Sequence, residues 1–302
     1  MKRVAVVGAG PAGLAAAVTA TQRGHRLTLF EAGETIGGHF DLARRIPGKE
    51  EFRAYTMMLD RHGVEIRLHS RAGIEELSGF HEVVLATGVV PRIPDIPGID
   101  HPMVLSYAEA ISGRPVGKTV AVVGVGGIGF DVSAFLVTTP AEPADDYRTP
   151  SIILEDWKAE WGAANPHEVR GALTAPAPAP AAREVYLLQR TRGPQGTRLG
   201  KTSGWVHRAS VKAKAVQQLS GVNYERIDDD GLHISFGHDR CGRRVLALDN
   251  VVICAGQNSV RDLDEGLRRR GLHPYVIGGA ARAAELDAKR AIRQGTELAA
   301  RL

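Results

Sequence analysis

A run of six residues near the start of the chain, Gly8-Ala9-Gly10-Pro11-Ala12-Gly13, constrains the fold more than any other feature. The apolar, β-branched segment 3–7 precedes it, and an alanine-rich segment from Leu14 to about Arg23 follows. Strand, glycine turn and helix therefore come in the order of a βαβ unit, which a second strand at 26–30 completes. In such a unit the first glycine allows the tight turn. The second lets the backbone approach a pyrophosphate, and the third lets helix and strand pack closely.

Glu31 stands at the end of the second strand, about 20 residues after the turn, where a carboxylate accepts hydrogen bonds from a ribose diol. The N-terminus of the intervening helix offers unpaired N–H groups to phosphates. A Gly37-Gly38-His39 turn follows, and in flavoproteins with two dinucleotide sites such a turn lies along the cofactor. His39 could equally be a loop histidine, and a glycine-rich turn without a ligand is the alternative for the whole unit.

A second glycine turn, Gly124-Val125-Gly126-Gly127-Ile128-Gly129, follows a predicted strand at 119–123 and precedes a predicted helix at 130–137. Two strand-turn-helix units in one chain of this length predict an α/β fold with two Rossmann-like, doubly wound domains. An insertion at about 138–183 separates the second turn from its next strand, 184–189. Within it we expect an extended surface run at 175–182 and a short amphipathic piece containing Trp157 and Trp161.

The strand at 184–189 ends in Gln189-Arg190, followed by Thr191-Arg192, and no acid stands there. A carboxylate would repel a 2′-phosphate, whereas guanidinium groups bind it bidentately, so we expect NADPH rather than NADH. The alternative is that Arg190 and Arg192 are solvated surface charges. Farther along, the pattern predicts a helix at 203–219, strands up to 255, and a last helix at 285–301.

Composition limits the class of protein. The net charge is +4, and the 38 basic and 34 acidic residues are interspersed, which suits anionic cofactors better than a nucleic-acid surface. The two cysteines, Cys241 and Cys254, form no Cys-x-x-Cys pair, which favours a reducing compartment and disfavours a thioredoxin-reductase-type activity. No apolar run reaches the ~18 residues of a membrane span. We expect a cytoplasmic protein with no membrane or nucleic-acid partner.

With both turns placed, the chain resembles, along its whole length, the FAD- and NADPH-binding half of bacterial NADPH-dependent 2,4-dienoyl-CoA reductase. That half belongs to the trimethylamine-dehydrogenase-like flavoproteins. The resemblance rests on motifs spread along the sequence: GAGPAGL at 8–14, IGGHF at 36–40, IPGKEEF at 46–52, LATGVVPR at 85–92, VLSY at 104–107, GGIGFD at 126–131, LGKTSGWVHR at 199–208, IDDDGLH at 227–233, NVVICAGQ at 250–257 and GGAARAAELDAKRAI at 278–292.

The resemblance implies that FAD and NADPH are the cofactors and that the NADPH-binding domain is inserted into the FAD-binding one. The expected domains are 1–108 and 249–302 for FAD, and 109–248 for NADPH. The backbone near Ala72 is expected to contact FAD. The candidate cofactor-binding residues, from the turns and the resemblance together, are Gly8, Gly10, Pro11, Ala12, Gly13, Glu31, Gly38, His39, Lys49, Ala72, Ala86, Thr87, Gly88, Gly124, Gly126, Gly127, Ile128, Gly129, Gln189, Arg190, Arg192, Gly256, Gly278 and Gly279.

The chain departs from the family pattern in two places. Many flavoproteins carry a Gly-Asp pair where this chain has Gly278-Gly279, and another acid is missing at Ala281, so backbone N–H groups must serve there. The sequence also shows no barrel and no four-cysteine cluster, and two cysteines cannot ligate a cubane. In the family, electrons pass from NADPH to FAD, then through an iron–sulfur cluster to FMN in a barrel. We therefore expect this polypeptide alone not to reduce dienoyl-CoA.

The expected activity is that of an NADPH-oxidising flavin reductase module. It would pass electrons to a partner polypeptide with an FMN and iron–sulfur barrel, or to a small acceptor. An electron-transfer subunit of a split enzyme and a non-catalytic nucleotide-binding remnant or scaffold are the alternatives. We name no catalytic acid or base and no metal ligand, because the cofactors supply the hydride chemistry.

Two groups of residues are weaker candidates around the cofactors. One follows the NADPH strand and could shape the nicotinamide side or form a plain surface helix: Lys201, Trp205, His207 and Arg208. The other begins the final helix, whose N-terminal dipole could stabilise reduced flavin: Asp287, Lys289 and Arg290.

Overall fold

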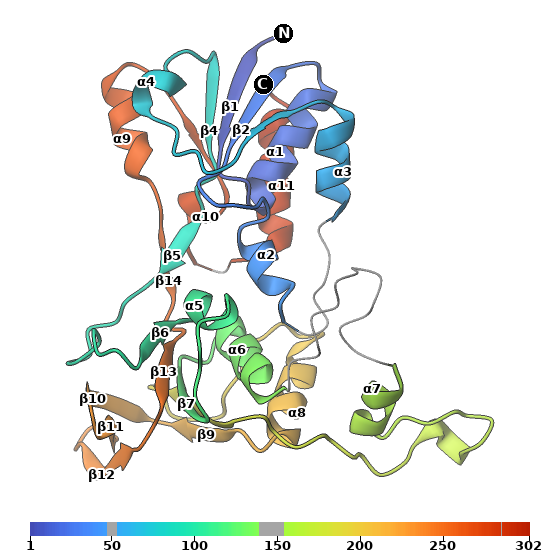
Figure 1. The fold of residues 1–302 in the computed structure, drawn as a ribbon, viewed down its shortest axis with the longest axis vertical. Helices are drawn as coiled ribbons and strands as arrows, with labels where there is room; N and C mark the ends of the chain where they lie inside the picture. The colour runs from blue at the N-terminus through green and yellow to red at the C-terminus, as the bar shows by residue number, and fades with distance from the viewer. Residues whose placement is uncertain (47–52, 139–153, 285) are drawn as a thin grey trace. The chain divides into compact units, whose positions relative to one another are not determined.

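The structure is a computed structural model, and it describes residues 1–46, 53–138, 154–284 and 286–302. The chain forms two compact units (Figure 1). The first contains Met1–Arg45 and Gln257–Leu302, with residues 53–90 between them, and the second contains Pro91–Gly256. These units end at residues other than the predicted domain limits. The reason is that strands near Val104 and Asn250 pair with the sheet of the second unit.

The first unit is built on a parallel five-stranded sheet in the order β15-β4-β1-β2-β3. The predicted strands at 3–7 and 26–30 are both present, and Val4 pairs with Leu27 on one side and Glu82 on the other. The strands are β1 (Arg3–Val7), β2 (Arg26–Phe30), β3 (Glu65–Arg67), β4 (Glu82–Leu85) and β15 (Tyr275–Val276).

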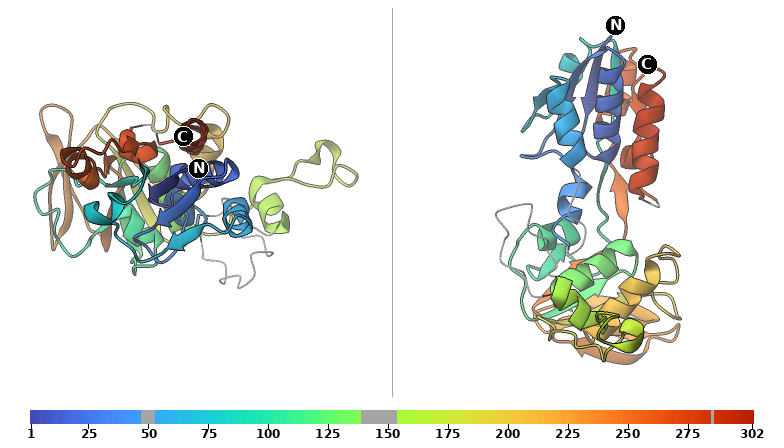
Figure 2. Two further views of the ribbon diagram at one scale, coloured as in Figure 1. Left: turned by 90° about the horizontal axis from the view of Figure 1, so that it is seen from above. Right: turned by 90° about the vertical axis from the view of Figure 1, so that its right-hand side faces the viewer.

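Helices cover both faces of this sheet, because successive residues of its strands are apolar and buried. Val84 packs with α1 (Pro11–Gln22), α3 (Arg53–Arg61) and α11 (Ala288–Ala299), whereas Val83 and Leu85 pack against α4 (Ile74–Leu77) and α9 (Asp262–Arg269). The helices α1 and α11 lie side by side (Figure 2). A Cβ on Gly295 would lie 2.2 Å from the carbonyl oxygen of Ala12, so only glycine allows this approach.

The second unit has its own parallel five-stranded sheet, in the order β6-β13-β7-β8-β9. A three-stranded antiparallel sheet, β10-β11-β12, accompanies it. The parallel strands are β6 (Val104–Ser106), β7 (Thr119–Val123), β8 (Glu184–Gln189), β9 (Gln217–Ser220) and β13 (Asn250–Ile253). The antiparallel strands are β10 (Val222–Asp228), β11 (Gly231–Phe236) and β12 (Cys241–Leu246).

The antiparallel sheet covers one face of the parallel sheet, since Val123 and Ile253 share a buried cluster with Leu232 and Ile234. The helix α6 (Gly127–Val137) packs against β7 and β8, whereas α5 (Tyr107–Ile111) packs against β6 and β13, and α8 (Gly204–Ala213) packs against α6. The fold class predicted from the sequence, α/β with two doubly wound parallel sheets, is confirmed.

The predicted helix at 203–219 is wrong in its second half. The helix α8 ends at Ala213, Ala215 has a φ of 56°, and Gln217–Ser220 pairs with β8 as strand β9. Gln217–Ser220 contains no β-branched residue, so its strand conformation depends on the pairing with β8 rather than on local preference.

Shorter elements complete the described chain. The expected amphipathic piece around the two tryptophans is a helix, α7 (Leu154–Trp161), and the run 175–182 has no helix or strand. The remaining elements are α2 (His39–Ala43), α10 (Gly278–Ala281), the 3-10 helix η1 (Arg170–Ala172), and the paired strands β5 (Val89–Pro91) and β14 (Gln257–Ser259). Among the residues described, no helix combines the length and the apolar character needed to cross a bilayer.

Candidate functional site

The first glycine turn has the shape of a phosphate cradle. Gly8 has a φ of +102°, and a Cβ there would lie 2.4 Å from the carbonyl oxygen of Ala86. A Cβ at Gly13 would lie 1.8 Å from the carbonyl oxygen of Gly8, whereas one at Gly10 would meet nothing within 4 Å. Gly8 and Gly13 are therefore required by packing, and Gly10 leaves open space beside the backbone, as a bound pyrophosphate needs.

This cradle lies where several parallel strands end. The crevice between β1 and β4 is a topological switch point, since the chain leaves β1 for β2 on one side and β4 flanks it on the other. A Cβ on Gly278, two residues after the end of β15, would lie 2.8 Å from the Cβ of Ala12. The helix α1 begins after Gly10 with no side-chain cap, so its first N–H groups are available to an anion.

Glu31 is tied to the turn and keeps acceptor capacity for a ligand. Its Oε2 accepts a hydrogen bond of 2.8 Å from the N–H of Ala9, and its Oε1 accepts one of 2.8 Å from Gly33. A carboxylate has about four lone-pair sites, so a ribose diol could still donate to it. The sequence predicted the position of this carboxylate but not its bond to the glycine turn.

The Gly37-Gly38-His39 segment lies against the first turn, as expected for a segment along a cofactor. The N–H of Gly37 donates to the carbonyl oxygen of Ala9 at 2.8 Å, and a Cβ on Gly38 would lie 3.2 Å from the Cα of Gly10. His39 Nε2 lies 3.3 Å from Nε2 of Gln257. Burial lowers the pKa of His39, which keeps its imidazole neutral. Gln257 was not a predicted site residue, because it is far from His39 in sequence.

Other predicted contacts in this unit would use the main chain. Ala72 and Ala86 are buried, and their predicted contact with a cofactor stays a prediction. The hydroxyl of Thr87 donates to the carbonyl oxygen of Val260 at 2.6 Å. Gly88 has a φ of +73° and open space at its Cα. Lys49 lies outside the described residues.

Gly278 and Gly279 are both shaped by close neighbours. Gly278 has a φ of +62°, and its N–H donates to Oε1 of Gln294 at 2.9 Å. A Cβ on Gly279 would lie 2.9 Å from Cγ1 of Val89, so the place where other flavoproteins carry an acid is sterically closed. We expected backbone N–H groups to contact the cofactor at this turn. The N–H of Gly278 already donates to Gln294 of α11, so it is not available for that contact.

The second glycine turn repeats the first closely. Gly124 has a φ of +118°, and a Cβ there would lie 2.3 Å from the carbonyl oxygen of Cys254. A Cβ on Gly129 would lie 1.9 Å from the carbonyl oxygen of Gly124, while Gly126 and Gly127 have nothing within 4 Å. Ile128 is half-buried in the first turn of α6. A second cradle thus opens α6 at the carboxyl end of β7.

The side chains at the end of β8 and just after it differ in burial and in hydrogen bonding. Gln189 is buried, and its Nε2 donates to the carbonyl oxygens of Thr191 at 2.8 Å and Gly193 at 3.3 Å, so its side chain supports its own loop. Arg190 and Arg192 are exposed. A Cβ on Gly237 would lie 2.6 Å from Nη2 of Arg192, which places that guanidinium over the glycine backbone. Two cations therefore stand at the edge of β8 and β9.

Tyr224, on β10, lies at the same edge and was not predicted. Its hydroxyl donates to the carbonyl oxygen of Leu188 at 3.3 Å. Burial raises the pKa of Tyr224, and the nearby charge of Arg190 opposes that rise.

Gly256, a predicted contact residue, is the last residue of the second unit before the chain enters the first. Its carbonyl oxygen accepts a hydrogen bond from the N–H of Arg92 at 3.0 Å.

The residues from Lys201 to Arg208 do not converge on one point. Arg208 Nη1 donates to the carbonyl oxygen of Gly196 at 3.0 Å, His207 Nδ1 lies 3.7 Å from Oδ1 of Asp131, and Lys201 is exposed. Trp205 meets Trp161 of α7 edge-on, with ring centroids 6.1 Å apart. These contacts attach α8 to α6, to the loop before α8 and to the insertion.

In the final helix, Asp287 caps α11: its side chain accepts a hydrogen bond of 3.0 Å from the N–H of Lys289.

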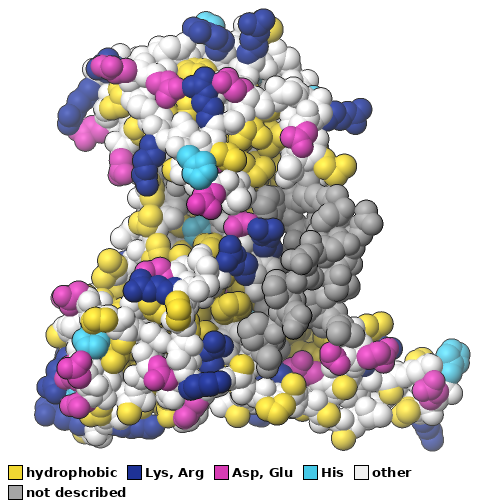
Figure 3. All heavy atoms as spheres, viewed as in Figure 1, with side chains coloured by type: hydrophobic (Ala, Val, Ile, Leu, Met, Phe, Trp, Pro, Cys, Tyr) yellow, Lys and Arg dark blue, Asp and Glu magenta, His cyan; other side chains and the backbone are white. Residues whose placement is uncertain are grey.

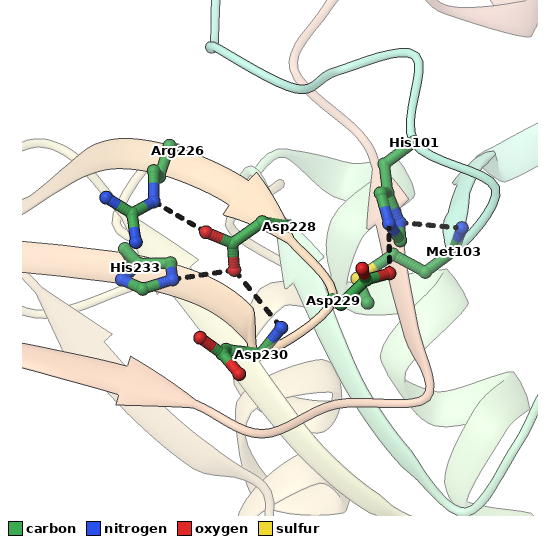
Figure 4. A network of polar contacts seen from close by, with 7 residues as sticks. All are labelled: His101, Met103, Arg226, Asp228, Asp229, Asp230 and His233. Atoms are coloured by element: carbon green, nitrogen blue, oxygen red, sulfur yellow. Dashed lines mark hydrogen bonds and ion pairs between the residues drawn. The ribbon is translucent and has the colours of Figure 1, made fainter.

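The IDDDGLH motif forms a polar network at the turn between β10 and β11 (Figure 4). Asp228 accepts from Nε of Arg226 at 2.6 Å and lies 2.7 Å from Nε2 of His233. These two partners, Arg226 first, lower the pKa of Asp228. Asp230 could join Asp228 and His233 around a metal ion, yet the negative charge of Asp228 is already balanced by its ion pair with Arg226. Basic side chains gather on the surface of this sheet (Figure 3). Because the polar contacts of the motif are made within the hairpin, we assign it a structural role there.

Comparison with known proteins adds the family. A model of the pyridine nucleotide-disulphide oxidoreductase family matches residues 2–272. A metal reductase of Desulforamulus reducens is 26% identical over 289 residues, which cover 92% of this chain and 41% of that protein. A bilirubin reductase of Mediterraneibacter gnavus is 33% identical over 272 residues, covering 83% and 39%. A 2-naphthoyl-CoA reductase structure aligns with a TM-score of 0.79 at 22% identity, over 100% of this chain and 40% of that one.

Proposed function

The chain belongs to the pyridine nucleotide-disulphide oxidoreductase family, whose members bind FAD and NAD(P), and on that premise we propose that it binds FAD in its first unit and oxidises NADPH bound in its second. FAD, when bound, would accept the hydride and pass its electrons on. The chain's own part is to bind the two nucleotides and orient them, and no acid or base of the protein is required for the transfer.

Two open phosphate cradles carry this proposal. In each, the outer glycines are closed by main-chain contacts and the middle glycine faces open space, at Gly10 in the first turn and Gly126 in the second. Each cradle also opens a helix whose first N–H groups lack a side-chain cap. The residues present therefore fit one dinucleotide in each unit.

The preference for NADPH is supported by the side chains at the edge of β8. Arg190 and Arg192 are exposed there, and the buried amide of Gln189 is committed to its own loop. A 2′-phosphate would meet guanidinium groups and no carboxylate in this loop, and the reverse holds beside the first turn, where Glu31 stands.

The onward electron acceptor belongs to the same proposal. The chain spans 41% of the length of the metal reductase and 39% of that of the bilirubin reductase, so those proteins carry long additional segments. We propose that electrons leave for a partner polypeptide with an FMN and iron–sulfur barrel, as in the dienoyl-CoA reductase pattern, or for a small acceptor. Cys241 and Cys254, the only cysteines, cannot ligate a four-thiolate cluster.

An anaerobic titration tests the proposal. The purified chain is reconstituted with FAD, and NADPH or NADH is added while the flavin absorption band is followed. We expect NADPH to bleach the band, with a kcat/KM at least about tenfold above that for NADH, given charge-assisted bonds to a 2′-phosphate. Bleaching by NADH alone would contradict the NADPH assignment. A chain that takes up no FAD would contradict the proposal that it is a flavin-dependent enzyme and would favour a nucleotide-binding remnant.

The same preparation separates the enzyme from an electron-transfer subunit. A module that turns over alone reduces a small artificial acceptor with NADPH at a steady rate. A subunit of a split enzyme has its natural acceptor on another polypeptide, so a tagged chain should retain a barrel-containing protein carrying FMN. Steady turnover without such a partner would favour the stand-alone module.

A further inference from the structure

We infer that Ser259 and Arg261 are positioning residues of the flavin site, because they hold its last turn, Gly278–Ala281, in the shape that would receive FAD. The inference rests on the proposed function. Neither residue carries a sequence signal for a cofactor, since Ser259 ends β14, Arg261 follows that strand, and both are far in sequence from the turn that they hold.

The contacts are direct and cover most of the turn. The hydroxyl of Ser259 donates to the carbonyl oxygen of Gly279 at 2.6 Å. Nε of Arg261 donates to the carbonyl oxygen of Ala280 at 2.5 Å, and its Nη2 donates to that of Ala281. Three successive carbonyl oxygens are thus fixed by two side chains from one short segment.

The same segment is fixed on its other side to the end of β4. The hydroxyl of Thr87 donates to the carbonyl oxygen of Val260 at 2.6 Å, and the N–H of Val260 donates to the carbonyl oxygen of Gly88 at 3.1 Å. Residues 259–261 therefore join the two strand ends, after β4 and after β15, where we place FAD contacts. Movement of this segment would move both.

The turn needs such support for a physical reason. The helix α10 has only 4 residues, too few to be stable by itself, and its last carbonyl groups have no partner within the helix. An acid at position 279 cannot serve in its place, because a Cβ there would lie 2.9 Å from Cγ1 of Val89 and 3.3 Å from the backbone of Gly88. The main chain of the turn must contact the cofactor, so its shape determines the fit.

Arg261 is solvent-exposed although its guanidinium makes these bonds. Exposure limits the strength of each bond and gives small ions access to the site. A guanidinium ion added to a variant without the Arg261 side chain could therefore occupy the same place and donate to the same carbonyl oxygens.

The test uses the full chain with Arg261→Ala and Ser259→Ala, and measures the dissociation constant of FAD by fluorescence. We expect Kd to rise roughly tenfold for Arg261→Ala, and less for Ser259→Ala, because bonds from a charged donor are the stronger. Added guanidinium chloride at low concentration should restore much of the affinity, and sodium chloride should not. Ser259→Thr keeps the hydroxyl and should bind FAD almost as the native chain does.

Arg268→Ala is the matched control, since Arg268 lies on α9 and its Nε pairs with Asp264 at 2.7 Å, away from the turn. Its Kd for FAD should be unchanged, and all variants should keep the native KM for NADPH. A native chain that binds no FAD overturns the proposed function. If the native chain binds FAD but Arg261→Ala binds it equally well, or loses affinity that guanidinium cannot restore, the positioning role alone is overturned.

Discussion

In the first glycine turn a Cβ at Gly13 would lie 1.8 Å from the carbonyl oxygen of Gly8, and in the second a Cβ at Gly129 would lie 1.9 Å from that of Gly124. The two cradles are thus closed by the same main-chain contact. The residues after the following strands have opposite charge: Glu31 in the first unit, and Arg190 with Arg192 in the second. The comparison shows that the same backbone packing shapes both turns, and in our proposal a few side chains specify which nucleotide each one binds.

The largest expected effect comes from filling a closed glycine. Gly13→Ala forces backbone to move, so we expect it to lower the free energy of unfolding of the first unit by roughly 3 kcal/mol and to abolish FAD binding. Gly10→Ala meets no protein atom within 4 Å, so it should block the pyrophosphate while costing at most about 1 kcal/mol of stability. Urea unfolding and FAD content measure both. Equal stability of the two variants would break the steric comparison.

The second expected effect concerns the cations of the second unit. The double variant Arg190→Ala, Arg192→Ala should lower kcat/KM for NADPH by roughly 30-fold, about 2 kcal/mol, and leave kcat/KM for NADH nearly unchanged. Arg198→Ala, an exposed arginine of the same loop, is the control and should change neither value. An equal loss for both nucleotides would mean that the arginines support the loop rather than the 2′-phosphate.

A smaller effect is expected at the carboxylate of the first unit. Glu31→Gln keeps one oxygen for the N–H of Ala9 or Gly33 and loses the charge that favours a ribose diol, so Kd for FAD should rise roughly tenfold. The KM for NADPH should not change. A variant that binds FAD as tightly as the native chain would show that Glu31 supports the turn and not the ribose.

The smallest effect is a dependence of stability on pH. Burial lowers the pKa of His39 below 6.5, so the unfolded chain takes up this proton at a higher pH than the folded chain. The stability that His39 contributes is therefore present above pH 6.5 and is lost as the pH falls through the folded-state pKa. Urea unfolding of the FAD-free chain above and below pH 6.5, compared with His39→Gln, measures it. An identical pH dependence in that variant would contradict the assignment.

The sequence predicted the elements whose cause is local. The strands at 3–7, 26–30, 119–123 and 184–189 are apolar, end at glycine or polar residues, and appear with those bounds. The strand β9 was missed because Gln217–Ser220 has no alternating pattern and takes its conformation from pairing with β8. The limits of the units could not be predicted for the same reason, since β6 and β13 join the second sheet through partners distant in sequence.

The candidate site divides in the same way. Glycine spacing predicted both cradles and the position of Glu31, and the cofactor assignments stay predictions. The partners that hold the site were missed, because Gln294 meets Gly278 and Arg261 meets Ala280 only after the chain has folded. At Gln189 the structure adds what the sequence did not predict: its buried amide bonds to its own loop, while its contact with a nucleotide stays a prediction.

The order in which the chain is synthesised bears on its two halves differently. Every strand of the second sheet lies between Val104 and Ile253, whereas β15 and α11 of the first come after Tyr275. A ribosome therefore releases the complete second sheet while the first still lacks an edge strand and the helix that packs on α1. Removing α11 by a late stop codon should expose the apolar surface of α1 and destabilise the first unit, although the second sheet has been made in full.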